Sequence, residues 1–306
     1  MQRRFIDYLV ISLKGMAMGA ADAVPGVSGG TIAFISGIYE ELITTISNIN
    51  VALFKTLFQK GFPSFWKQLN GNFIVSLLLG IIVSFVSFMR LAKYLLENEP
   101  VLIWSFFFGL IIASIYFVGK QITKWRISTI IAAILGAAIA FYISSMPTLG
   151  NNNSTIFLFF AGAIAICAMI LPGISGSFIL IILGAYKTLS DALHDFDIKK
   201  IAVFAIGALV GLLSFSHLLK WLFKHYHNMT LAILTGFIFG SLNKVWPWKE
   251  TLTWHTDSKG LKTPLLDKSV SPWAFNGDNQ LIWAILLMVL GFLTIFILEK
   301  ISSKKD

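Results

Sequence analysis

Long apolar segments separated by short polar ones dominate this chain. Several are long enough to cross a hydrocarbon core of about 30 Å as helices, including residues 73–89, 101–118, 127–146, 201–219 and 281–298. The chain is 56% hydrophobic and only 13% charged, with a mean hydropathy of +0.78, a balance that soluble domains do not show. The pattern therefore predicts an all-α polytopic membrane protein.

The chain contains an internal repeat. When the sequence is shifted by 147 positions, residues 15–46 align with 162–193, and 11 of the 32 positions are identical. The identities include a Pro-Gly-x-Ser-Gly motif that occurs in both halves at matching positions, at 25–29 and 172–176. A shared apolar composition alone would not reproduce this motif in register, so the two halves are interpreted as homologous.

The match resumes at an offset of 127, where Gly80 aligns with Gly207 and Gly109 with Gly236. The difference between the offsets, 147 minus 127, is 20 residues, which the first half holds in an extra loop around residues 48–72. We therefore predict two repeats of the same architecture. Each contains a re-entrant hairpin, whose helix is broken by the motif, followed by about three transmembrane helices.

The predicted boundaries follow from the two offsets. Repeat 1 covers residues 1–149, with its hairpin at about 5–46 and its spans within about 73–146. Repeat 2 covers 150–306, with its hairpin at about 155–193 and its spans within about 201–298. Both repeats form one integrated membrane domain.

Loop charges predict the orientation of the two repeats. Lysines and arginines concentrate in loops that the positive-inside rule assigns to the cytoplasm, together with both termini. Three crossings separate the two hairpins, and because three is odd, the second repeat is expected to be inverted relative to the first. Residues 246–280 then form a long external loop, in which Trp246, Trp248, Trp254 and Trp273 suggest an interfacial surface.

The two motifs have the chemistry of an anion site. Proline ends one helical segment and suits the first turn of the next, whose unpaired N–H groups attract anions. If both hairpin tips meet near the middle of the membrane, they would form one site. The candidate phosphate-binding residues are Pro25, Gly26, Ser28, Gly29, Gly30, Thr31, Pro172, Gly173, Ser175, Gly176 and Ser177. The alternative is that glycine and serine only permit close helix packing and that proline kinks a continuous span.

Charged residues within or beside the apolar segments are further candidates. Asp22 precedes the first motif and aligns with Met169, so it is either an asymmetric site for a coupling proton or sodium ion, or a simple helix cap. The other candidates for charge balance or coupling are Lys14, Glu40, Arg90, Lys93 and Lys220. Their alternative role is ordinary: long charged side chains near helix ends reach toward the membrane surface.

Several kinds of site are not expected. Cys167 is the only cysteine, so no intramolecular disulfide can form, and no His or carboxylate spacing predicts a metal site. The net charge of +9 is spread through short loops, which indicates membrane topology rather than nucleic acid binding. No cofactor is expected beyond a coupling gradient of H⁺ or Na⁺.

The motifs resemble a known family. Residues 14–31 with 37–40, and residues 171–177 with 184–186, are similar to the two signatures of bacterial polyprenyl-phosphate transporters, long described only as a domain of unknown function. The resemblance implies a transporter rather than an enzyme. It would move undecaprenyl phosphate, or a related polyprenyl phosphate, from the outer to the inner leaflet of the cytoplasmic membrane and so recycle the lipid carrier for peptidoglycan. It also suggests coupling to an ion gradient.

Two other functions stay open at this point. Undecaprenyl-pyrophosphate phosphatases also combine inverted repeats with a Pro-Gly-x-Ser motif, but there an arginine follows the serine, where this chain has Gly29 and Gly176. An anion channel with paired half-helices would fit the electrostatics but not the signature. The sequence does not determine the oligomeric state.

Overall fold

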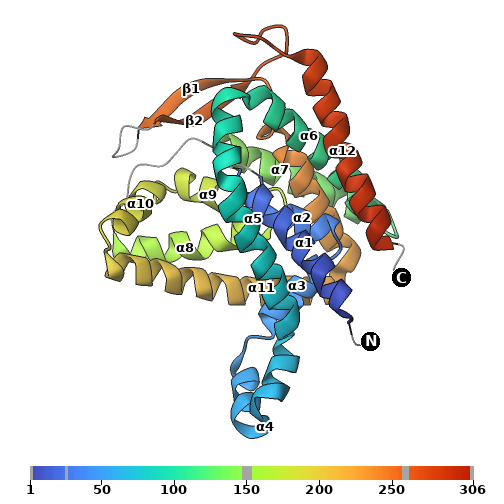
Figure 1. The fold of residues 1–306 in the computed structure, drawn as a ribbon, viewed down its shortest axis with the longest axis vertical. Coiled ribbons are helices and arrows are strands. Elements are labelled where there is room, and N and C mark those ends of the chain that lie inside the picture. The colour runs from blue at the N-terminus through green and yellow to red at the C-terminus, as the bar shows by residue number, and fades with distance from the viewer. Residues whose placement is uncertain (1–2, 25–26, 147–153, 257–261, 304–306) are drawn as a thin grey trace.

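The computed structural model describes residues 3–24, 27–146, 154–256 and 262–303, and is built almost entirely of helices (Figure 1). In chain order the elements are α1 (Phe5–Asp22), α2 (Gly29–Ile35), α3 (Tyr39–Ser47), α4 (Val51–Leu69), α5 (Gly71–Asn98), α6 (Pro100–Lys120), α7 (Ile127–Ser145), α8 (Thr155–Ile170), α9 (Gly176–Ile182), α10 (Tyr186–His194), α11 (Ile198–Gly240), η1 (Ser241–Asn243), β1 (Lys249–Thr256), β2 (Lys262–Ser269) and α12 (Leu281–Ser303).

The long helices match the predicted spans. Among the described residues, four helices are long and apolar enough to cross a membrane: α5, α6, α7, and α11 with η1. The bent pair of α9 and α10 gives a fifth span if it is counted as one, and the described parts of α8 and α12 are shorter apolar helices. The prediction of an all-α protein with several membrane spans is therefore confirmed.

The second half differs from the prediction at one boundary, because α11 continues through the expected end of a span. The helical geometry is interrupted only at Tyr226, with φ −135° and ψ 45°. Glu99, which separates α5 from α6, has nearly the same backbone, with φ −134° and ψ 51°, and lies 226 − 99 = 127 positions earlier. Pro100 begins α6 and separates the two helices there, whereas no proline follows Tyr226 and the helix resumes.

Close helix packing recurs at matching positions of the two halves. In α5, a Cβ on Gly80 would overlap the carbonyl oxygen of Ser12 in α1, and in α11 a Cβ on Gly207 would overlap that of Phe159 in α8. These two glycines are related by 127 and their two partners by 147. Glycine permits this approach because it has no side chain, and close backbone packing is a main source of helix association in lipid.

The region predicted as an external loop contains a β hairpin, in which β1 pairs antiparallel with β2. The tryptophans there do not form a single interfacial surface, as the sequence suggested. Trp248 is buried, with 3% of its surface exposed, and its indole N–H donates to Asn279 O, whereas Trp273 is 81% exposed. The side chain of Trp254 lies outside the described residues. Apart from this hairpin and η1, the described secondary structure is α-helical.

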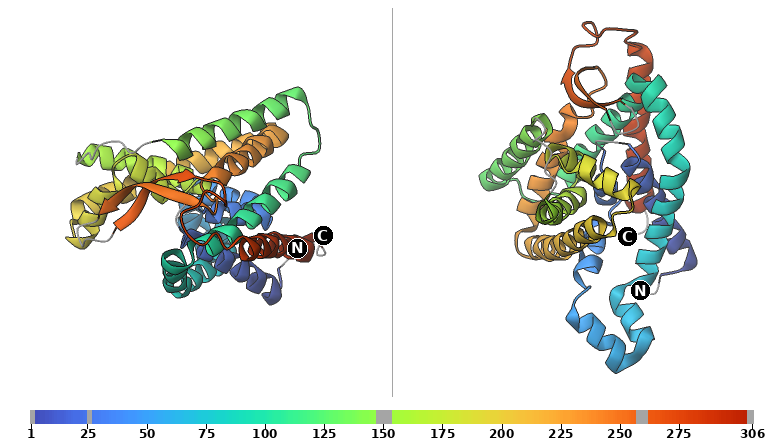
Figure 2. Two further views of the ribbon diagram at one scale, coloured as in Figure 1. Left: turned by 90° about the horizontal axis from the view of Figure 1, so that it is seen from above. Right: turned by 90° about the vertical axis from the view of Figure 1, so that its left-hand side faces the viewer.

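The extra segment of the first half is also structured, since most of it forms α4 rather than a loop. Gly61, at φ 78°, breaks α4 into two parts. The two parts project from the helical body at the end opposite the β hairpin (Figures 1 and 2). Such a projection requires few contacts with the body, which explains how 20 residues can be present in one half only.

Candidate functional site at the hairpin tips

The first hairpin consists of α1, the short helix α2 and α3. Ser28 is the N-cap of α2, and its hydroxyl accepts a hydrogen bond from Gly30 N at 3.2 Å. This capping satisfies one of the free N–H groups at the start of the helix. Pro25 and Gly26, which the sequence also assigned to the phosphate site, lie outside the described residues.

The second hairpin has the same order, with α8, α9 and α10. Pro172 is buried, and Gly173 has φ 86°, a backbone conformation that glycine adopts without strain. Helices α9 and α10 meet at 106°. The Ser175 and Ser177 hydroxyls lie 3.0 Å apart; Ser175 is partly exposed and Ser177 is exposed.

The two motifs are in direct contact. The backbone N–H of Gly173 donates to Thr31 Oγ1 at 2.9 Å. The Ser28 hydroxyl lies 3.3 Å from Met169 O and 3.4 Å from Leu171 O, so it can donate to either. A Cβ on Gly30 would come within 2.7 Å of Ile170 O. Segments about 142 positions apart therefore form one compact junction.

The hydroxyls of this junction have different roles in the structure. Ser28 and Thr31 are buried, at 3% and 0% exposure, and both are used to join the two hairpins. Ser175 and Ser177 remain accessible and bond each other. Of the four hydroxyls that the sequence singled out, the two in the second motif are thus the ones positioned to meet a ligand in this conformation.

Asp22 lies at the start of α2. Its Oδ1 accepts a hydrogen bond from Gly29 N at 2.7 Å, and a Cβ on Gly29 would collide with the carboxylate. Asp22 therefore caps the first half-helix, which is the simpler of its two predicted roles. The carboxylate occupies the place where a free anion would meet that helix. Its counterpart, Met169, contributes its carbonyl oxygen to the junction instead.

The other charged candidates make contacts away from the two motifs. Lys14 Nζ donates to Ser36 O at 2.6 Å, and Lys220 Nζ donates to Asn48 Oδ1 at 3.0 Å. Lys93 lies 3.8 Å from Glu97 on the exposed side of α5, where Arg90 is also exposed. Glu40 pairs with His227 at 3.0 Å. These partners lie outside the two motifs.

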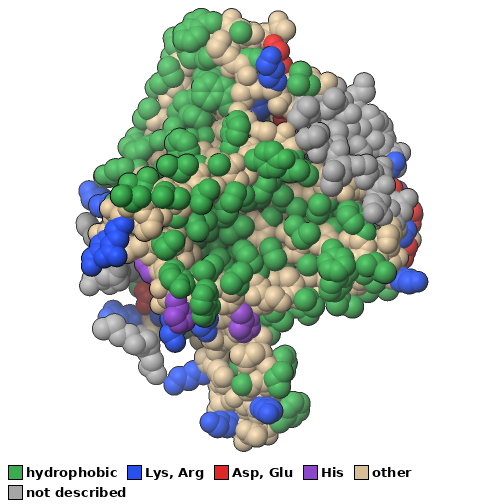
Figure 3. All heavy atoms as spheres, turned by 180° about the vertical axis from the view of Figure 1, so that it is seen from behind, with side chains coloured by type: hydrophobic (Ala, Val, Ile, Leu, Met, Phe, Trp, Pro, Cys, Tyr) green, Lys and Arg blue, Asp and Glu red, His purple; other side chains and the backbone are tan. Residues whose placement is uncertain are grey.

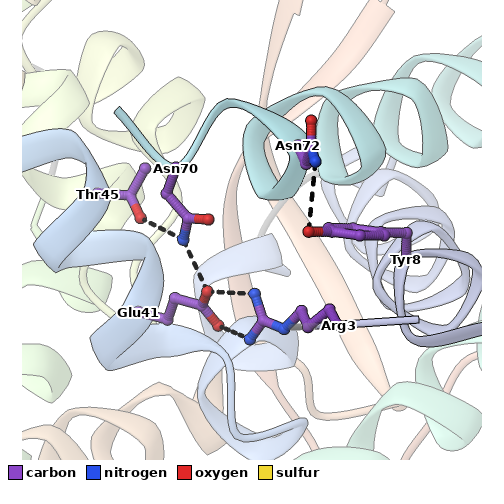
Figure 4. A network of polar contacts seen from close by, with 6 residues as sticks. All are labelled: Arg3, Tyr8, Glu41, Thr45, Asn70 and Asn72. Carbon is purple, nitrogen blue, oxygen red and sulfur yellow. Dashed lines mark hydrogen bonds and ion pairs between the residues drawn. The ribbon is translucent and has the colours of Figure 1, made fainter. Parts of the chain in front are cut away.

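A polar network that sequence reasoning missed holds the end of the first hairpin that contains the start of α1 (Figure 4). Both guanidinium Nη atoms of Arg3 donate to Glu41 at 2.6 Å, and Asn70 Nδ2 donates to the same carboxylate at 2.8 Å. The network joins the segment before α1, α3 and the start of α5. Bidentate pairs of this kind fix geometry well, although a separation of 38 positions conceals the pair in the sequence.

An apolar groove runs along α11 from the kink at Tyr226 toward the second motif. It has a volume of about 400 Å³ and is lined by Leu171 together with α11 side chains such as Phe215, Leu222, Met229 and Phe237. Leu171 directly precedes the motif proline, so the groove reaches the junction. Hydrophobic side chains also cover much of one outer face of the molecule (Figure 3).

A second, narrow cleft adjoins the second motif on the side of the β hairpin. Gly173, Ile174 and Ser175 line it together with Lys244. Lys244 lies just before the predicted external loop of residues 246–280, and sequence reasoning did not consider it for the site. Its position directly after the long apolar segment of α11 was the available signal. No group of three or more candidate metal ligands occurs among the described residues.

Comparison with known proteins identifies the family. The family model described as VCA0040-like, undecaprenyl phosphate translocase-like, matches residues 18–263. The chain belongs to this family. A polyprenyl-phosphate transporter of Vibrio cholerae serotype O1 (strain ATCC 39315 / El Tor Inaba N16961) is 43% identical over 308 residues, covering 99% of this chain and all of the relative.

A second family relative is the polyprenyl-phosphate transporter of Staphylococcus aureus (strain NCTC 8325 / PS 47). It is 32% identical over 254 residues, covering 77% of this chain and 85% of the relative. No solved structure matches the chain. The family and the apolar helices together indicate a multi-pass membrane protein with a role in transport.

Proposed function

We propose that the chain moves undecaprenyl phosphate, or a closely related polyprenyl phosphate, from the outer to the inner leaflet of the bacterial cytoplasmic membrane. The observation that carries the proposal is the junction of the two motifs through Thr31 and Gly173. Membership of a family whose relatives are named polyprenyl-phosphate transporters supplies the substrate. The lipid carrier would thereby be returned for peptidoglycan synthesis.

The phosphate would bind where the hairpins meet. The accessible hydroxyls of Ser175 and Ser177 offer donors there, and hydrogen bonds to a charged phosphate are stronger than those to a neutral group. The groove along α11 would take part of the prenyl chain, since its lining is apolar and includes Leu171. Head and tail would then be recognised side by side.

Transport between leaflets requires access from both sides, and we propose that the two halves have inverted orientation in the membrane. The repeated contacts of Gly80 and Gly207 support two homologous halves. The loop charges support an odd number of crossings between them, with both termini in the cytoplasm. Small movements of one half against the other would open the junction to alternate leaflets.

We propose that ion coupling involves Asp22 most directly. Its carboxylate occupies the start of α2 and has no acidic counterpart in the second half. Binding of H⁺ or Na⁺ to this group would change the charge next to the junction. The change would then favour arrival or release of the phosphate.

Reconstitution separates this proposal from the alternatives. Proteoliposomes carrying labelled undecaprenyl phosphate should show protein-dependent transfer between leaflets, without release of phosphate from undecaprenyl pyrophosphate. Phosphate release would instead indicate the phosphatase. Ion conductance without lipid transfer would indicate a channel.

A further inference from the structure

Two lysines lie at the base of the β hairpin, close to the second motif. Lys244 follows η1, and Lys249 is the first residue of β1. The Lys249 ammonium donates to the backbone carbonyl of Lys244 and lies 3.7 Å from the centre of the Trp104 ring. The Lys244 ammonium lies 4.3 Å from the centre of the Phe178 ring on α9. Both side chains are thus packed against aromatic faces.

This cluster carries more positive than negative charge. The carboxylate of the cluster belongs to Asp267 and lies 3.8 Å from the Lys244 ammonium. It also accepts a hydrogen bond from the Thr251 hydroxyl at 3.1 Å. Aromatic rings and a carbonyl stabilise a cation only partly, and removing an ammonium from water is costly unless it is paired. Two ammonium groups facing one carboxylate would therefore be stabilised by an additional anion.

The cluster opens onto the motif. Lys244 lines the same narrow cleft as Gly173, Ile174 and Ser175, and Ser144 of α7 also lines it. A cation and two serines therefore line one space. At the offset of 127, Lys244 aligns with Phe117 of the first half and Lys249 aligns with Ile122. Neither lysine therefore has a charged counterpart in the first half.

We propose that Lys244 binds the phosphate monoester of the lipid at the second motif, and that Lys249 positions Lys244. This inference rests on the proposed function for the identity of the lipid. The chemistry that Lys244 recognises is the phosphate dianion itself. The site would lie on the face of the junction nearest the β hairpin, where the substrate enters in the proposed orientation.

The charge of Lys249 makes the site sensitive to pH. Burial and the neighbouring Lys244 ammonium lower the pKa of Lys249 to about 7. A phosphate dianion nearby would favour the protonated lysine and so raise this pKa. Phosphate binding is therefore expected to weaken as pH rises above about 7.

The test compares purified full-length variants for binding of farnesyl phosphate, inorganic phosphate and farnesol. Lys244→Gln should weaken farnesyl phosphate binding by about tenfold, the value of one charge-assisted contact, while Lys244→Arg retains most of it. Lys268→Gln, on an exposed side chain of the same hairpin, should bind as the wild type does. Inorganic phosphate should show the same ranking, and farnesol should not distinguish the variants.

The outcomes separate the two proposals. If folded Lys244→Gln binds farnesyl phosphate as well as Lys268→Gln does, the role of Lys244 is overturned, whether or not the wild type transports. Binding of phosphate that depends on Lys244, in a wild type that moves no polyprenyl phosphate, supports the site and overturns the proposed function. Thermal unfolding of each variant establishes that the protein is folded.

Discussion

Single residues determine how the two hairpins meet, and Thr31 is the clearest case. Its hydroxyl is the acceptor for Gly173 N–H in a fully buried position. Thr31→Val keeps the shape but leaves that N–H without its acceptor, at a cost of about 1–3 kcal/mol. We expect lower thermal stability and slower lipid transfer, with recovery in Thr31→Ser.

The control for this variant is Thr294→Val. Thr294 donates only to Leu290 O within its own helix, α12. Loss of this hydroxyl should have little effect on the melting temperature or on lipid transfer. Equal effects of the two Thr→Val changes on transfer would contradict a special role for the junction.

A single substitution at Asp22 separates its two proposed roles, the cap of α2 and the site of ion coupling. In Asp22→Asn, the amide oxygen still accepts the hydrogen bond from Gly29 N, so α2 should remain capped and the protein folded. The fixed negative charge is lost, so the dependence of transfer on a pH or Na⁺ gradient should disappear. Asp195→Asn, which makes the same change at an exposed carboxylate after α10, is the matched control.

Gradient dependence in Asp22→Asn equal to that of the wild type would leave Asp22 with the capping role alone.

The sequence identified Asp22 and both motifs. It did not reveal that Ser28 and Thr31 bond the opposite hairpin, because those partners lie more than 140 positions away. Lys244 was missed for a related reason, since only the fold returns the loop after α11 to the motif.

At the scale of the elements, repeated glycine contacts predict paired effects. Gly80→Ala and Gly207→Ala each introduce a Cβ against backbone of a neighbouring helix, which cannot move without separating the helices. Each should lower the melting temperature by several degrees. A Cβ on Gly119 would meet only atoms at 3.9 Å or more, so Gly119→Ala should have little effect.

Destabilisation by Gly119→Ala as large as by the other two would show that helix glycines matter for reasons other than these contacts.

The spans themselves could be predicted because apolar runs of this length have few alternatives. The boundary inside α11 could not, because a helix continues through a polar segment when tertiary contacts support it. The β hairpin was missed because its short polar strands form only by pairing.

Lys249 gives the β hairpin a distinctive pH response. The pKa of Lys249 is lowered from 10.5 to about 7, so between these values the unfolded chain binds a proton that the folded protein does not. The contribution of this group to folding stability therefore rises as pH increases from about 7 toward 10.5. Lys249→Met should remove that component.

Melting temperatures of wild type and Lys249→Met across pH 7 to 9 check this expectation. The difference between the two proteins should shift in favour of the wild type as pH rises. A constant difference would contradict the lowered pKa. Lys268→Met, which changes an exposed lysine on β2, controls for the loss of one charge.

At the scale of the whole molecule, the account depends on sidedness. The β hairpin and α4 lie at opposite ends (Figure 2), and we predict that the first is external and the second cytoplasmic. In a Cys167→Ala background, Lys268→Cys should react with an impermeant thiol reagent added outside cells. Lys60→Cys on α4 should react only after the membrane is opened, and labelling of both from one side would contradict the proposed orientation.

The central claim is that the lipid phosphate binds at the junction of the two motifs and that the protein carries the lipid between leaflets from there. The most direct measurement is transfer of labelled undecaprenyl phosphate in proteoliposomes containing wild type, Ser175→Leu or Ser87→Leu. Ser175 lines the cleft at the second motif, whereas Ser87 is exposed on α5 and bonds only its own helix. The account predicts transfer by wild type and Ser87→Leu and none by folded Ser175→Leu; normal transfer by Ser175→Leu would contradict it.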